Sequence, residues 1–144
     1  MERLISNLMT GEHKKIEIFL ERFEKALEIN LEEAKKMFNI FKWTLEKHFF
    51  IEERAIFVVN DSVIGQEVDI VFELLKQHGE LMEIVKEIEE NLNNDVAFNF
   101  KMLKEKLTKH SLFEDDEFYP KLDEELEPEK KQEIIERIKE IIRG

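Results

Sequence analysis

Four histidines and two glutamates in this chain have the types and the spacing of a metal site. The chain of 144 residues contains no cysteine, which excludes thiolate zinc sites, iron–sulfur clusters, disulfides and cysteine nucleophiles. Its only histidines are separated by 35, 30 and 32 residues: His13, His48, His78 and His110. Glu52 and Glu114 each stand four residues after a histidine, and residues i and i+4 share one face of a helix. Any bound metal must therefore be held by imidazole and carboxylate.

This ligand set predicts two metal ions rather than one. Four imidazoles and two carboxylates are too many ligands for a single ion. An ionised glutamate without a partner is also costly to bury in an apolar interior, and two cations bridged by the carboxylates would offset that cost. Imidazole and carboxylate without sulfur suit iron, manganese or zinc. We favour iron, because a mixed His/carboxylate pair with open positions suits redox chemistry and dioxygen-type ligands.

Hydrophobic periodicity predicts the helices that must carry these ligands. Apolar side chains recur at three- and four-residue intervals over four long ranges, about 10–29, 31–59, 66–90 and 95–120, and over a shorter one, about 128–143. Each long range carries one histidine on its apolar stripe. The connections are short, so we expect an all-α, up-down-up-down four-helix bundle with a short C-terminal fifth helix. We expect residues 1–144 to form a single domain, with the bundle at about 10–120.

Individual residues mark the expected helix ends and the expected outer faces. Asn30 can cap the second helix through a capping box with Glu33, and Asp95 is a candidate cap for the fourth. Tyr119 stands nine residues after His110. That spacing places it on the opposite side of an ideal helix, which argues against a role as metal ligand or radical.

The second and fourth helices repeat one motif, His-x-x-x-Glu. The chain therefore consists of two helical hairpins, each with one histidine on its first helix and a His-x-x-x-acid motif on its second. Ferritin-like di-iron bundles use a different motif, Glu-x-x-His. The residues three positions before the four histidines are Thr10, Leu45, Leu75 and Leu107. No Glu-x-x-His motif is present, so the ferritin-like class is excluded.

On these residues the sequence resembles the hemerythrin-like (HHE cation-binding) domains. The resemblance covers about residues 10–120 and closes in Phe118-Tyr119-Pro120. It implies a four-helix bundle around a non-haem di-iron centre, with two histidines on each iron. It also implies that Glu52 and Glu114 bridge the irons, together with an oxo or hydroxo group.

Two departures from the oxygen-carrying hemerythrins affect the expected site. Those proteins have a fifth histidine one turn after the third-helix histidine, where this chain has Met82. They also place the last bridging acid five residues after its histidine, which here is Asp115. Position i+4 lies about 40° from His110 around the helix and i+5 about 140°, so we favour Glu114 and keep Asp115 as the alternative. Glu17, one turn after His13, is a further candidate ligand that we expect at the surface or behind the ligands.

Four histidines with two glutamates look more like the hemerythrin-like domains of the iron-centre repair family and of iron-sensing regulators. Our hypothesis is a non-haem di-iron protein that binds or senses a small ligand such as dioxygen, nitric oxide or peroxide, or that handles iron. The sequence leaves open whether the protein is an enzyme, and we favour a metal- and ligand-binding protein. A di-iron oxidase, peroxidase or ferroxidase and an iron-centre repair protein are alternatives. A metal-free helical interaction module is the third hypothesis.

Composition bears on partners and location. There are 22 Lys and Arg residues against 34 Asp and Glu, and the net charge of −12 has the wrong sign for attraction to nucleic acid or anionic membranes. The N-terminus lacks both a basic stretch and a long apolar run, which predicts a soluble cytoplasmic protein. Both a monomer and a homodimer are compatible with the sequence.

Overall fold

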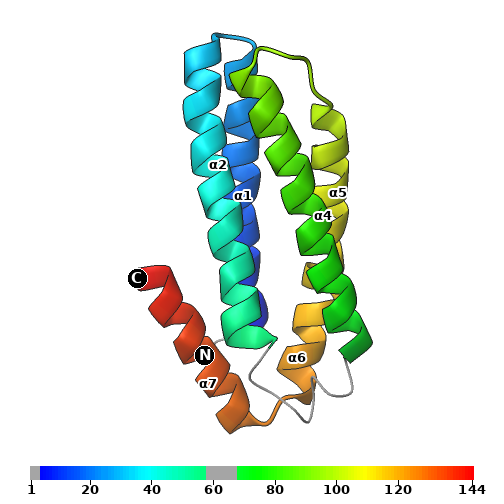
Figure 1. The fold of residues 1–144 in the computed structure, drawn as a ribbon. Helices are drawn as coiled ribbons and strands as arrows, with labels where there is room; N and C mark the ends of the chain where they lie inside the picture. The colour runs from blue at the N-terminus through cyan, green and yellow to red at the C-terminus, as the bar shows by residue number, and fades with distance from the viewer. Residues whose placement is uncertain (1–3, 58–67) are drawn as a thin grey trace.

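The structure is a computed structural model, and it describes residues 4–57 and 68–144. In these two ranges the chain forms helices and no strand. The α-helices are α1 (Ile5–Leu27), α2 (Leu31–Ile51), α4 (Val68–Asn93), α5 (Phe100–Phe113), α6 (Tyr119–Glu125) and α7 (Pro128–Arg143). Two π-helical segments, η1 (Glu52–Ile56) and η2 (Glu114–Phe118), continue α2 and α5. Figure 1 shows α1, α2, α4 and α5 side by side along the bundle, with α7 packed outside near the end that holds the N-terminus. The predicted all-α bundle with a C-terminal helix is confirmed.

The first helix begins earlier than predicted, at Ile5 instead of about Thr10. The Asp123 carboxylate accepts hydrogen bonds from the backbone N–H groups of Ile5 (2.8 Å) and Ser6 (3.0 Å) and from the Ser6 hydroxyl (2.6 Å). These N–H groups have no partner inside the helix, and a negative charge at a helix N-terminus is stabilising. A cap supplied from more than a hundred residues away leaves no local pattern in the sequence.

The two predicted helix caps have different outcomes. Asn30 is confirmed as a cap, since its side-chain oxygen accepts from the Glu33 N–H at 2.8 Å. Asp95 is wrong as a cap: Asn99 fills that role, accepting from the Met102 N–H at 3.0 Å. Asp95 instead has a φ of 55° and lies just after α4, where a left-handed residue commonly ends a helix.

Both π-helical segments begin at a glutamate that stands four residues after a histidine. Glu52 opens η1 and Glu114 opens η2. A π-helical turn holds an extra residue, so it rotates every later side chain around the helix axis. The fourth predicted helix consequently does not end at Pro120 but continues through η2 into α6. The predicted end of the second helix at Val59 and start of the third at Gln66 lie outside the described residues.

Two apolar clusters fill the bundle, one on each side of the histidines. One cluster joins the start of α1, η1, α6 and α7, where Ile134, Ile135 and Ile138 of α7 are buried. The other joins the later part of α1 to α2, α4 and α5. In each long helix the histidine falls in the sequence between members of one cluster and members of the other. The packing therefore holds a polar layer between two apolar cores. None of the helices in the described ranges is long and apolar enough to span a membrane.

Candidate metal centre

The six predicted ligands meet in the polar layer. Each long helix contributes one histidine, and the first residue of each π-helical segment contributes a carboxylate. All six side chains are buried: His13, His48, Glu52, His78, His110 and Glu114. Glu52 and Glu114 have no exposed surface at all (0 %).

Their inner atoms form two overlapping groups, each within 4.8 Å, that share Glu114. In the first group, His13 Nε2 lies 3.1 Å from His48 Nε2 and 3.0 Å from Glu114 Oε1. In the second group, His78 Nε2 lies 3.0 Å from Glu52 Oε1, and His110 Nε2 lies 3.2 Å from Glu114 Oε1. Two carboxylate oxygens therefore stand among four imidazole nitrogens.

These distances and unsatisfied atoms fit metal ions. Neighbouring ligands at about 2.1 Å from one ion are about 3.0 Å apart when they subtend a right angle at it, which is the spacing found here. His110 Nε2 and Glu114 Oε2 are buried and have no hydrogen-bond partner among the described residues. Leaving such atoms unpaired costs about 1–3 kcal/mol each, and a cation would satisfy both. His48 Nδ1 is also unpaired, and nothing in the structure explains it.

Three histidines contact a side chain from another helical segment through Nδ1, the nitrogen that faces away from the donor cluster. His13 Nδ1 pairs with Asp115 Oδ1 at 2.8 Å, and His78 Nδ1 pairs with Glu53 Oε2 at 3.0 Å. The third pairing is between His110 Nδ1 and Gln77 Oε1, at 2.6 Å. A proton held at Nδ1 leaves the Nε2 lone pair free to face the metal.

The alternative sequence candidates lie around the site in different ways. Asp115 contacts the outer nitrogen of His13, so it stands behind that ring while Glu114 points into the cluster. Glu17 is exposed on α1 and is absent from both donor groups. Met82 is half-buried and borders a cleft beside His78.

The prediction that Tyr119 lies on the side of the helix away from the site is wrong. Its side chain is fully buried, and its hydroxyl donates a 2.8 Å hydrogen bond to Glu52 Oε2. Its ring lies 5.7 Å from that of His13. The prediction assumed an ideal α-helix from His110 onward, whereas η2 adds a residue per turn and rotates Tyr119 toward the site.

Sequence reasoning also missed Glu53 and Gln77. Glu53 directly follows the predicted ligand Glu52, and Gln77 directly precedes the predicted ligand His78. Each reaches across to a histidine on another helix, so the pairing depends on how the helices pack. Adjacency to a ligand was the only signal that the sequence offered.

The surrounding charges set the protonation of the metal-free site. Burial lowers the pKa of His48, but the Glu52 and Glu114 carboxylates outweigh it and raise that pKa to about 10. Burial would raise the pKa of Glu114, yet hydrogen bonds with Glu52 and the surrounding imidazoles hold it well below its ordinary value. Burial and the same two carboxylates raise the pKa of Tyr119 well above its ordinary value, so its hydroxyl remains a donor. Metal binding to this site must therefore release protons.

A four-helix bundle with a buried layer of four imidazoles and two carboxylates defines a class of metal-binding protein. The family model for the hemerythrin HHE cation binding domain matches residues 4–122. The chain therefore belongs to the hemerythrin HHE cation-binding family, as its motifs predicted. No curated protein and no solved structure matches it.

Proposed function

We propose that this protein holds a non-haem di-iron centre and binds a small ligand, such as dioxygen or nitric oxide, at that centre. The observation that carries the proposal is the pair of donor groups joined by Glu114. His13 and His48 would hold one metal, and His78 and His110 would hold the other. Iron fits a set without sulfur, and manganese or zinc are the alternatives to test.

The bound metals would supply reversible binding of a diatomic ligand. Two histidines on each metal leave positions for an exogenous ligand, because Met82 stands where a fifth histidine would add another protein ligand. The clefts bordering His110, His13 and His78 have volumes of about 280, 250 and 360 Å³. These volumes lie at or below the low end of the range for organic ligands, which favours a small ligand.

Aromatic side chains of the chain shield the centre from water. The Phe49 ring stacks on the His78 ring, with centroids 3.9 Å apart. Phe57 stacks on the same imidazole at 5.8 Å. Both phenylalanines are buried, as are Phe118 and Tyr119. An apolar wall of this kind limits water and strengthens the electrostatic interactions inside it.

Metal analysis tests the proposal. We expect two irons per chain after anaerobic loading with ferrous iron, and an absorption spectrum of the oxidised protein that changes on adding azide. Well under one iron per chain would contradict the proposal. A stable adduct supports ligand binding, whereas sustained turnover of peroxide or ferrous iron would establish the enzymatic alternative instead.

A matched pair of variants separates the proposed site from the acidic surface. Glu52→Gln should lower the iron content to about one per chain, because it removes the carboxylate that lies 3.0 Å from His78 Nε2 and 3.2 Å from His48 Nε2. Glu17→Gln should keep two irons, because Glu17 is exposed and lies outside both donor groups. Equal iron content in the two variants would remove Glu52 from the site.

A further inference from the structure

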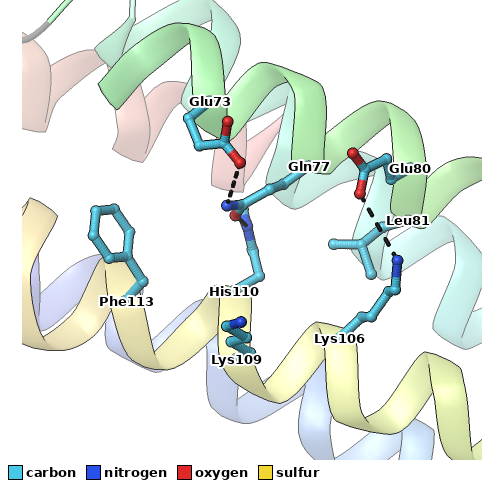
Figure 2. Close-up of a pocket in the computed structure, with 8 residues that line it drawn as sticks. All are labelled: Glu73, Gln77, Glu80, Leu81, Lys106, Lys109, His110 and Phe113. Carbon is cyan, nitrogen blue, oxygen red and sulfur yellow. Dashed lines mark hydrogen bonds and ion pairs between the residues drawn. The ribbon is translucent and has the colours of Figure 1, made fainter. Parts of the chain in front are cut away.

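The side chains that contact Nδ1 of the histidines, here called outer supports, differ in charge. Carboxylates hold His13 and His78, through Asp115 and Glu53. A neutral amide, Gln77, holds His110. Figure 2 shows Gln77 reaching from α4 to His110 on α5. A histidine that donates to a carboxylate is a stronger donor to its metal than one that donates to an amide, so these supports predict unequal ligands.

A chain of hydrogen bonds fixes the orientation of His110. The Glu73 carboxylate can only accept, and Gln77 Nε2 donates to its Oε1 at 3.3 Å. The amide oxygen of Gln77 must then face His110, where it accepts from Nδ1 at 2.6 Å. His110 Nε2 consequently carries the lone pair and points into the donor group, where Glu114 Oε1 lies 3.2 Å away but no described residue meets it with hydrogen-bond geometry.

His110 also borders open space. Together with Gln77 and Phe113, it lines a cleft of about 280 Å³ between α4 and α5. An ion pair between Glu80 and Lys106, with its charged atoms 3.8 Å apart, stands at the rim. The clefts beside His13 and His78 differ from this one. In each of them a carboxylate that lines the cleft, Asp115 or Glu53, contacts the outer nitrogen of the histidine.

We propose that His110 is the ligand that releases and rebinds the metal most readily. Gln77 is the positioning residue that sets the rate of this release. The His110 ring turns toward the α4–α5 cleft when its bond to Gln77 opens, and metal enters and leaves on that side. Glu73 supports this role by fixing the amide. The inference rests on the proposed metal centre and adds the path by which metal enters and leaves it.

Two substitutions of Gln77 change the support in opposite directions. Gln77→Leu removes the acceptor and should raise the rate constant for metal extraction by a chelator about 10- to 100-fold, the usual effect of losing an outer support. Gln77→Glu, made together with Glu73→Gln so that two carboxylates do not face each other, supplies a carboxylate like those at His13 and His78 and should slow extraction below the wild-type rate. Glu80→Gln is the control, since Glu80 lines the same cleft but pairs with Lys106 instead of His110.

The measurement is chelator extraction from the metal-loaded full chain, with the unfolding midpoint of each metal-free variant as a check on folding. Opposite shifts for the two Gln77 variants, with Glu80→Gln unchanged, support the inference. Equal rates, or equal acceleration by both, overturn it while leaving the proposed function intact, provided that the wild type binds two metals. A wild type that binds no metal overturns the proposed function itself.

A second readout does not depend on bound metal. Nitrogen-15 NMR of the metal-free protein should show the His110 proton on Nδ1 in the wild type and in Glu80→Gln. Gln77→Leu should lose that preference. A proton on Nε2 in the wild type would contradict the positioning role.

Discussion

The two halves of the metal centre are built differently. The half between α1 and α2 brings His13 and His48 to 3.1 Å from each other, with Glu114 against both histidines and Glu52 against His48 alone, at 3.2 Å. The half that involves α4 and α5 places His78 and His110 with two carboxylates, Glu52 and Glu114. Both carboxylates belong to the second donor group and only Glu114 belongs to the first, so the second position should better stabilise a more highly charged ion. The two metals of the proposed centre would therefore differ in charge environment and in ease of exchange.

The largest expected effect comes from Glu114, the carboxylate that both halves share. Glu114→Ala removes a ligand from each group, so the iron content should fall from two to below one per chain. The stabilisation that iron gives to the folded protein should disappear with it. Iron analysis and thermal unfolding with and without iron measure both effects.

Asp116→Asn is the matched control, because Asp116 is exposed in the same π-helical segment and is absent from both donor groups. It should behave as the wild type. Loss of only one iron in Glu114→Ala would show that the halves are not joined by this residue.

Stability against pH should distinguish the metal-free from the loaded protein. The folded-state pKa of His48 is about 10 and the ordinary value is 6.5. Its imidazolium therefore stabilises the metal-free fold fully below pH 6.5, and this contribution is lost as the pH rises toward 10. Glu114, with its lowered pKa, stabilises the fold above its ordinary value of 4.5 and loses that effect in acid.

Denaturant unfolding at pH 6 and pH 9.5 measures this dependence. The metal-free protein should be less stable at the higher pH. The metal-loaded protein should lack that loss, since its imidazole nitrogens hold metal in place of protons. Equal losses in both forms would contradict the placement of His48 at the metal.

The outer carboxylates offer a way to weaken one half at a time. Asp115→Asn changes the support of His13, and Glu53→Gln changes that of His78. Each should lower metal affinity about 10- to 100-fold at its own half and much less at the other. A two-site metal titration resolves the halves. A uniform decrease at both sites in either variant would contradict separate halves.

The smallest expected effect is that of Tyr119→Phe. The substitution removes a hydrogen bond to the buried Glu52 carboxylate, which lies in only one of the two donor groups. The metal-free protein should lose about 1–2 kcal/mol of its free energy of unfolding, and both irons should still bind. Denaturant unfolding checks the value. Tyr119→Leu serves as the comparison, since it also removes the ring and should cost more.

The cluster of donor side chains and the bundle could be predicted because their signals are local. His48 and Glu52 share a helical face through an i, i+4 spacing, and each histidine falls on an apolar stripe. The supports behind the ligands could not be predicted in the same way. Gln77 and Asp115 meet their histidines across helices, and Tyr119 reaches Glu52 only because a π-helical turn rotates it inward. Helical periodicity carries no information about either effect.

The unequal metal pair is the central claim, and the Mössbauer spectrum of the protein loaded with iron-57 tests it most directly. Two irons in different ligand sets should give two quadrupole doublets of equal area. Gln77→Leu should alter the doublet of the iron held by His78 and His110 and leave the other unchanged. A single doublet from a protein with two bound irons, or a single iron per chain, would contradict the account.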